Sequence, residues 1–144
     1  MRKKINNYSF DEIEVGLVEQ FEEKITKDML SSFEKITGDI NPLHTDVDYA
    51  KLNGFPDLVV YGMLSASFFS KLAGVYIPGK KSLIHNVNIN FHNPAFIGDT
   101  LTVSGEVKEK DDRFNLIKLK LKVLNQNSLR VISGSMQIGL LTKD

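Results

Sequence analysis

Four stretches in the second half of the chain alternate between apolar and polar residues, and this alternation limits the possible folds more than any other feature. Residues 86–92 and 117–123 alternate strictly, while residues 101–107 and 132–140 alternate with small interruptions at glycines. A period of two places every second side chain on the same face of a strand. The pattern therefore predicts half-buried strands, with the charged segment 108–113 as a hairpin connection between two of them.

The first half of the chain carries helical signals instead. Residues 25–36 place apolar side chains at helical spacing, with Thr26 suited to cap the N-terminus of a helix and Gly38 suited to end it. Residues 46–52 predict a short second helix. A third helix is predicted to begin at Gly62, and its residues are apolar or small nearly all round, which is typical of a helix buried inside a domain.

Helices that precede an antiparallel sheet indicate the α+β fold class. One apolar helix together with a sheet that has one wet face predicts a curved antiparallel sheet wrapped around a central apolar helix. The length of 144 residues fits one domain. We therefore expect a single domain over residues 1–144, in which residues 1–8 form a flexible tail.

The composition argues against several classes of function. The 18 basic and 18 acidic residues cancel, so no net field draws the chain toward nucleic acid or a membrane. The chain has no cysteine, and its three histidines lack the paired spacing of a metal site, so we expect no metal. No apolar run reaches roughly 18 residues, and the basic N-terminus lacks the apolar core of a secretory signal. A cytoplasmic protein is the resulting expectation.

The segment TGDINPLHTD, residues 37–46, places an acid and an imidazole on either side of a stiff loop. Pro42 fixes one backbone dihedral, and Asn41 before it is restricted to extended conformations. Asp39 and His44 could hold one water between them, so that one group removes a proton and the other supplies one. That chemistry suits addition or loss of water at a carbon–carbon double bond. The alternative is that Asp39 only makes an Asx turn.

Gly62 is a second candidate for chemistry because it opens the apolar helix. Free backbone N–H groups at a helix N-terminus can bind a developing oxyanion, such as the oxygen of a thioester carbonyl. The alternative interpretation is that glycine allows close packing or a turn. Ser65 and Ser67 on the same helix are expected to bond to their own backbone.

The motif FEKITGDINPLH over residues 33–44, with Ala50 six residues further on, resembles the signature of the MaoC-like (R)-specific enoyl-CoA hydratases. The similarity continues through YGMLSAS at residues 61–67, through Ser70, and through NPAFIGD at residues 93–99. It covers roughly residues 10–107. One departure is Tyr61, where the family often has histidine.

The resemblance implies a hot-dog fold, a homodimer, and substrate tunnels near the subunit interface. It implies that Asp39 and His44 are the catalytic pair, that the Gly62 N–H polarises the thioester carbonyl, and that Ser70 and Asn41 are supporting residues. The implied activity is that of a lyase of fatty acid metabolism, an enoyl-CoA hydratase or 3-hydroxyacyl dehydratase that converts trans-2-enoyl thioesters to (R)-3-hydroxyacyl thioesters. No cofactor is implied beyond the carrier of the thioester substrate, which is coenzyme A or acyl carrier protein.

Two other functions stay open on the sequence alone. A thioesterase on the same fold would use a carboxylate to direct water at the carbonyl, although the pairing of Asp39 with His44 disfavours it. A non-catalytic subunit that binds acyl thioesters would keep the tunnel and the dimer without turnover. The basic pair Lys80–Lys81 is a candidate for contact with a phosphopantetheine carrier.

Overall fold

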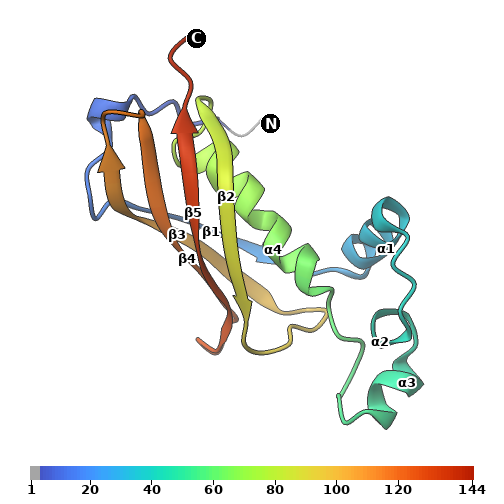
Figure 1. Cartoon of the computed structure of the whole chain (residues 1–144). Helices are drawn as coiled ribbons and strands as arrows, with labels where there is room; N and C mark the ends of the chain where they lie inside the picture. Colours follow the sequence, from blue (N-terminus) through green and yellow to red (C-terminus); the bar gives the residue numbers. More distant parts are fainter. Residues whose placement is uncertain (1–3) are drawn as a thin grey trace.

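The computed structural model describes residues 4–144 and shows an antiparallel sheet of five strands curved around one helix (Figure 1). The strands are β1 (Val18–Lys24), β2 (Ser82–Phe91), β3 (Thr100–Asp111), β4 (Leu116–Leu124) and β5 (Arg130–Leu140). The helices are α1 (Lys27–Thr37), α2 (Pro42–Thr45), α3 (Val47–Leu52) and α4 (Gly62–Lys71), with short turns of 3-10 helix at η1 (Phe10–Glu12) and of π-helix at η2 (Leu72–Tyr76). This architecture confirms the α+β class and the central helix.

The strand order is β1-β3-β4-β5-β2, and every neighbouring pair is antiparallel. All four strands predicted from alternation are present. The hairpin between β3 and β4 is shorter than the expected 108–113, because β3 continues to Asp111 and β4 already begins at Leu116. One interruption of the pattern has a packing cause, since a Cβ on Gly105 would lie 2.8 Å from Cδ2 of Leu72. Glycine at that position lets the C-terminal end of the central helix approach the sheet.

The two edges of the sheet differ in chemistry. The edge strand β1 was not anticipated, because only Phe21 among its residues is buried and charged side chains occupy four of its seven positions. The opposite edge strand, β2, contains no charged residue. Its apolar residues are nevertheless exposed in the single chain, with Val87 at 40% and Phe91 at 54%. An uncharged edge strand with exposed apolar side chains is an open site for strand pairing.

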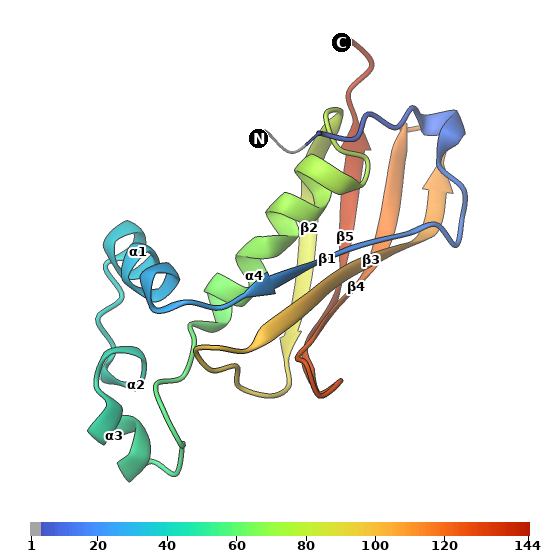
Figure 2. The same cartoon turned by 180° about the vertical axis from the view of Figure 1, so that it is seen from behind.

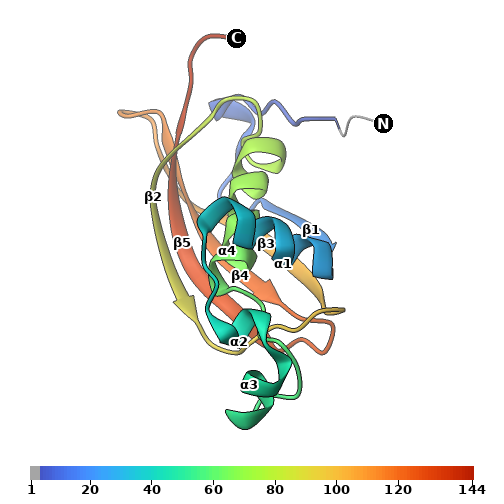
Figure 3. The same ribbon diagram turned by 90° about the vertical axis from the view of Figure 1, so that its right-hand side faces the viewer.

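The central helix α4 is covered on one side only, which corrects the expectation that it is buried all round. Leu64, Ala66 and Phe69 are buried against the sheet. A stripe of exposed residues follows the other face, and in it Met63 is 61% exposed and Ser70 is also exposed. The view along the sheet in Figure 3 shows α4 inside the curve of the strands, with the side away from the sheet uncovered.

The N-terminal segment corrects the expected tail over residues 1–8. The Asn6 amide donates to the carbonyl of Val75 at 2.9 Å, and the Tyr8 amide donates to that of Pro78 at 3.1 Å. The Tyr8 hydroxyl also donates to Glu19 Oε1 on β1 at 2.7 Å. Residues 6–8 are therefore fastened across the C-terminal end of the central helix, while the part of the expected tail at residues 1–3 lies outside the described residues.

Helices α1, α2 and α3 lie beyond one end of the sheet, as both face-on views show (Figures 1 and 2). They form one continuous excursion of the chain between β1 and α4. Within residues 4–144, no helix combines the length and the apolar character that a membrane crossing requires. The loop expected to carry the chemistry belongs to this excursion, next to the N-terminus of α4.

Candidate active site

The position of Asp39 depends on where helix α1 begins and ends. The Thr26 hydroxyl caps the helix by accepting from the Met29 amide, and Gly38 ends it in the left-handed conformation at φ 73°. Both signals were predicted from the sequence. The Thr37 hydroxyl then accepts from the Asp39 amide at 3.2 Å and donates to the carbonyl of Phe33 at 2.8 Å. These bonds fix the direction in which the chain leaves α1 and approaches Asp39.

The Asp39 carboxylate makes the Asx turn that was the alternative to a catalytic role. Its Oδ1 accepts from the Asn41 amide at 3.1 Å. This bond engages one oxygen of the carboxylate, and the hydrogen bonds between described residues do not engage Oδ2. A turn and a chemical role are therefore compatible, because the bond that shapes the loop leaves the second oxygen available.

His44 lies on helix α2, where a loop was expected. Asn41 caps this four-residue helix by accepting from the Leu43 amide at 2.9 Å, and Pro42 occupies the first turn, where its missing N–H has no cost. Asn41 thus has a local structural role. The short helix keeps the spacing from Asp39 to His44 rigid, as the stiff-loop hypothesis required.

The His44 ring is oriented by the strand-like segment that precedes α4. Its Nδ1 lies 2.6 Å from the carbonyl oxygen of Val59. A carbonyl oxygen can only accept, so Nδ1 carries a proton, and in the neutral ring Nε2 is then the acceptor. The neutral ring therefore presents a lone pair on Nε2, the nitrogen that a general base needs.

A cavity of about 830 Å³ lies between α4 and β2, and both candidate catalytic residues line it. Gly62 and Ser70 line it as well, so four of the five predicted site residues meet here, and Asn41 does not. The rest of the wall is largely apolar and consists of Phe33, Thr37, Tyr61, Met63, Ala66, Ser67, Phe69, Ile84, Val87, Ile89, Phe91 and Met136. The cavity can hold an apolar chain with polar groups at one end.

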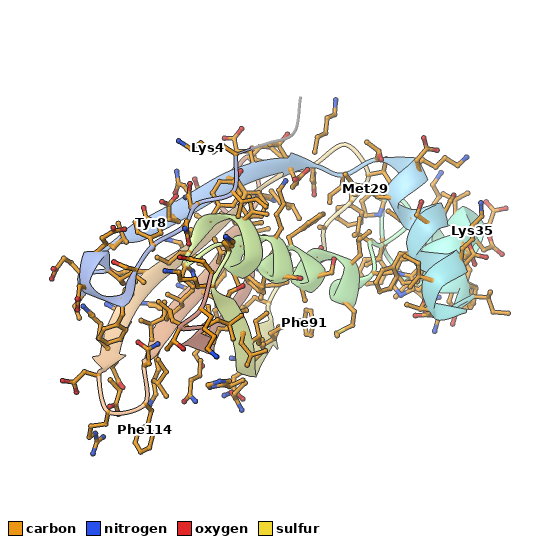
Figure 4. The ribbon with its side chains drawn as sticks, turned by 90° about the horizontal axis from the view of Figure 1, so that it is seen from above. Lys4, Tyr8, Met29, Lys35, Phe91 and Phe114 are labelled. Atoms are coloured by element: carbon orange, nitrogen blue, oxygen red, sulfur yellow. The ribbon has the colours of Figure 1, made fainter. Side chains whose placement is uncertain are left out.

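Gly62 faces this cavity across from the last residue of β2. A Cβ built on Gly62 would lie 3.0 Å from Cε1 of the Phe91 ring, so a larger residue would displace that wall. Figure 4 shows the Phe91 side chain beside the end of α4 that points toward α1. Within residues 4–144, the amides of Gly62 and Met63 donate to no protein acceptor, as expected for the first turn of a helix. Two donors are therefore available at the polar end of the cavity.

Ser67 and Ser70 are the exposed serines of α4. The Ser67 hydroxyl donates to the carbonyl of Leu64 at 2.6 Å, the bond to the helix backbone that was anticipated. Ser70 lies three residues further along the exposed stripe and lines the cavity.

Tyr61 also belongs to the site, although the sequence predicted no role for it. Its hydroxyl donates to the backbone carbonyl of Asp39 at 2.7 Å, and its ring stacks on the imidazole of His44 with the centroids 4.1 Å apart. The only signal in the sequence was that tyrosine departs from the histidine common at this place in the family. Nothing in the local pattern indicated a contact that spans 22 residues.

The other candidates for contact or chemistry do not line the main cavity. His92 Nε2 is 2.6 Å from the Ser133 hydroxyl, and this histidine lines a smaller cavity that His44 and Gly62 also border. His85 Nδ1 is 3.1 Å from the side-chain amide of Gln137. The pair Lys80–Lys81 precedes β2, where Lys81 is 3.6 Å from Asp144. Since the ten residues of β2 span about 30 Å, these lysines lie far from Phe91 in the same chain.

The chain matches one known protein family, described as MaoC like domain, over residues 11–127. Among characterised relatives, an (R)-specific enoyl-CoA hydratase of Aeromonas caviae is 30% identical over 132 residues, which cover 92% of this chain and 98% of the relative. A mitochondrial 3-hydroxyacyl-[acyl-carrier-protein] dehydratase of Solanum lycopersicum is 29% identical over 125 residues, covering 85% of this chain and 74% of the relative.

Comparison with solved structures identifies the same kind of protein. An R-hydratase of Pseudomonas aeruginosa in its unliganded form superposes with a TM-score of 0.90 at 29% sequence identity, covering 96% of this chain and 89% of that one. Sequence and structure comparisons thus agree with each other along nearly the whole chain.

Proposed function

The chain belongs to the MaoC-like domain family, and from this premise we propose that it is a hydro-lyase acting on acyl thioesters. It hydrates trans-2-enoyl thioesters reversibly to (R)-3-hydroxyacyl thioesters. The observation that carries this proposal is that Asp39, His44 and Gly62 together line a cavity whose wall is otherwise largely apolar. Acid–base groups, amide donors and an acyl pocket are the three parts that this reaction needs.

The substrate is placed by the two kinds of wall. The acyl chain lies along the apolar residues of α4, β2 and β5, and the thioester carbonyl lies at the amides of Gly62 and Met63. Because the double bond is conjugated to that carbonyl, C3 is two bonds from the carbonyl carbon. We place C3 beside Asp39 and His44, which line the same cavity as Gly62 and can hold a water molecule between them.

The proton and electron changes are balanced by these groups alone. One of Asp39 and His44 removes a proton from water as the oxygen bonds to C3, and the π electrons move through C2 to the thioester oxygen. The Gly62 N–H stabilises the negative charge on that oxygen. The proton taken from water passes on to C2 through these two groups, so one water is added in total and both groups return to their starting states. No cofactor is needed beyond the carrier of the acyl group.

The reaction is tested by following two signals on the same sample. A hydratase lowers the absorbance of the conjugated enoyl thioester without releasing free thiol. A thiol-trapping reagent run in parallel should therefore give no signal. Thiol release without hydration would replace this proposal with the thioesterase. If neither signal changes with coenzyme A and acyl carrier protein substrates of several chain lengths, the remaining interpretation is a non-catalytic subunit that binds acyl thioesters.

We also propose that the working form is a homodimer joined through β2. This strand is the uncharged edge of the sheet, whereas β1 is blocked by charged side chains. The exposed Val87 and Phe91 of β2, together with Met63 on α4, would be covered by a second copy. The cavity borders these residues, so the second copy would also close it.

Pairing through β2 would change the place of the Lys80–Lys81 pair. If two copies of β2 pair antiparallel about a centred two-fold axis, the start of the partner's strand lies beside the end of this one. The lysines from the partner would then lie near Phe91, at the cavity, where the phosphates of either carrier need cations. Changing both lysines to glutamine should raise KM for coenzyme A thioesters but not for N-acetylcysteamine thioesters, which lack phosphate.

A further inference from the structure

Tyr61 contacts both residues assigned to proton transfer and joins them to the body of the molecule. It is 2% exposed and directly precedes α4, so its backbone is anchored at the start of the central helix. Its hydroxyl reaches the backbone of Asp39, and its ring stacks on His44. These are separate parts of one side chain, each acting on a different member of the pair.

The hydrogen bond from Tyr61 is the one that links Asp39 to a residue far away in sequence. Within residues 4–144, the other hydrogen bonds of Asp39 go to Thr37 and Asn41, its near neighbours in sequence. The bond from Tyr61 to the Asp39 carbonyl, at 2.7 Å, crosses from the excursion to the start of α4. Since Asp39 itself is exposed, without that bond the loop would be held to the rest of the protein only through its flanking helices.

The stacking contact acts on the face of the His44 ring, whereas the hydrogen bond to Val59 acts on its edge. The bond from Nδ1 to Val59 fixes the direction of the ring edge, and the stacked tyrosine, inclined by 30°, limits rotation of the ring plane. Phe33 of α1 packs against the tyrosine ring at 4.8 Å. The imidazole is thus oriented by a backbone acceptor and by an aromatic face that is itself packed.

We propose that Tyr61 is a positioning residue that holds Asp39 and His44 in a single geometry, an inference that rests on the proposed hydratase function. The hydroxyl positions the acid and the ring positions the imidazole. Tyr61→Phe therefore removes the tie to Asp39 and keeps the support of His44, while Tyr61→Leu removes both.

The hydroxyl is suited to remain a donor. Burial raises the pKa of Tyr61 above its ordinary value, and the nearby carboxylates of Glu34 and Asp39 raise it further. The proton that makes the bond to the Asp39 carbonyl is therefore retained throughout the neutral range. A phenolate at this position would have no proton to donate to the Asp39 carbonyl and would repel the carboxylate of the same residue.

The kinetic test separates positioning from general stability. Tyr61→Phe should lower kcat about tenfold with KM within about twofold, because misplacement of a reacting group affects the chemical step. In the Asp39→Asn background the same change should have almost no further effect. Tyr76→Phe is the matched control, since Tyr76 stacks on Phe21 away from the cavity and should leave kcat unchanged.

An unchanged kcat for Tyr61→Phe, or an equal loss in the unmodified protein and in the Asp39→Asn background, would overturn the proposal. Nuclear magnetic resonance supplies a readout that needs no turnover. The ring protons of His44 should keep the shift caused by the stacked ring in Tyr61→Phe and lose it in Tyr61→Leu, while the Asp39 amide signal moves in both. If the unmodified protein hydrates no enoyl thioester, the proposed function fails, and these resonances still decide whether Tyr61 positions the pair.

Discussion

The Nδ1 atom of His44 lies 2.6 Å from the carbonyl oxygen of Val59, and this contact determines which nitrogen of the ring is left for chemistry. Val59 is itself fixed, because its amide donates to the Leu43 carbonyl at 3.1 Å and it forms a β-bridge with Phe96. Helix α2 is therefore tied to the segment before α4 by two bonds to one residue. The position of the imidazole relative to Gly62 depends on a short path of backbone contacts.

The first prediction concerns the acid–base pair. Asp39→Asn and His44→Asn should each lower kcat by about 10²- to 10⁴-fold, because each removes a group that transfers a proton. The double variant should be little worse than the more damaged single variant, since groups that act as a unit are not additive. Steady-state kinetics with an enoyl thioester measure all three, and thermal unfolding should show little change in Tm.

Matched controls make this prediction specific. Asp57→Asn and His85→Asn repeat the same replacements at residues that line neither the main cavity nor the smaller one beside it, and both should leave kcat unchanged. Asparagine makes the same Asx turn as aspartate, so a purely structural Asp39 would tolerate the change. Turnover close to that of the unmodified protein by a folded Asp39→Asn variant would remove the catalytic assignment.

The second prediction concerns Gly62. Gly62→Val should lower kcat/KM by about 100-fold, because the new side chain enters the space in front of the Phe91 ring and displaces the substrate from the amide donors. Gly74→Ala is the matched control, since a Cβ there would have its nearest neighbour, the Ser82 hydroxyl, at 4.0 Å. A folded Gly62→Val dimer with normal turnover would show that the oxyanion site lies elsewhere.

The third prediction concerns the assembly. The unmodified protein should be a dimer at micromolar concentration, and Val87→Lys on β2 should convert it to a monomer by placing a charge on the pairing edge. Gln20→Lys, on the edge strand β1, should leave the dimer intact. Light scattering coupled to size-exclusion chromatography distinguishes these states. A monomeric unmodified protein, or a dimer that survives Val87→Lys and dissociates with Gln20→Lys, would contradict pairing through β2.

The fourth prediction concerns the N-terminal segment at high pH. The hydrogen bond to Glu19 raises the pKa of Tyr8 to about 12, with burial and the negative charges nearby adding to it. Because the folded pKa lies above the ordinary value of 10.0, the stabilisation is fully present below pH 10.0 and is lost as the pH rises toward 12. A phenolate absorbance titration should show a tyrosine titrating near pH 12 whose signal is missing in Tyr8→Phe. Glu19→Gln should move that titration to lower pH, and an unmoved titration would refute the cause given.

The parts of this fold that could be predicted from sequence are those governed by neighbours in the chain. Thr26 and Gly38 bound α1 because capping is a local interaction, and Asp46 caps α3 in the same way. Alternation predicted four strands, of which β3, β4 and β5 bury side chains as expected, whereas no residue of β2 is buried in the single chain. Asp39 and His44 could be predicted to lie close together because both belong to one short motif, and both line the main cavity.

The parts that could not be predicted depend on contacts far apart in sequence. Strand β1 carries mostly charged residues because it is an edge strand, so its own pattern does not distinguish it from a loop. Whether a side of α4 is covered depends on how far the sheet curves, which no residue of α4 encodes. The role of Tyr61 follows from a hydrogen bond across 22 residues, and a tyrosine before a glycine gives no indication of it.

Because α1–α3 lie beyond the sheet, the residues proposed to react and the residues that shape the acyl pocket come from different segments of the sequence. Asp39 and His44 are encoded between β1 and α4, whereas much of the apolar wall comes from β2 and β5, including Ile84 and Met136. Substitutions in those strands can therefore resize the acyl pocket without altering the proton-transfer groups. One reaction can in this way be adapted to new acyl chains by changes in a part of the sequence that takes no part in the chemistry.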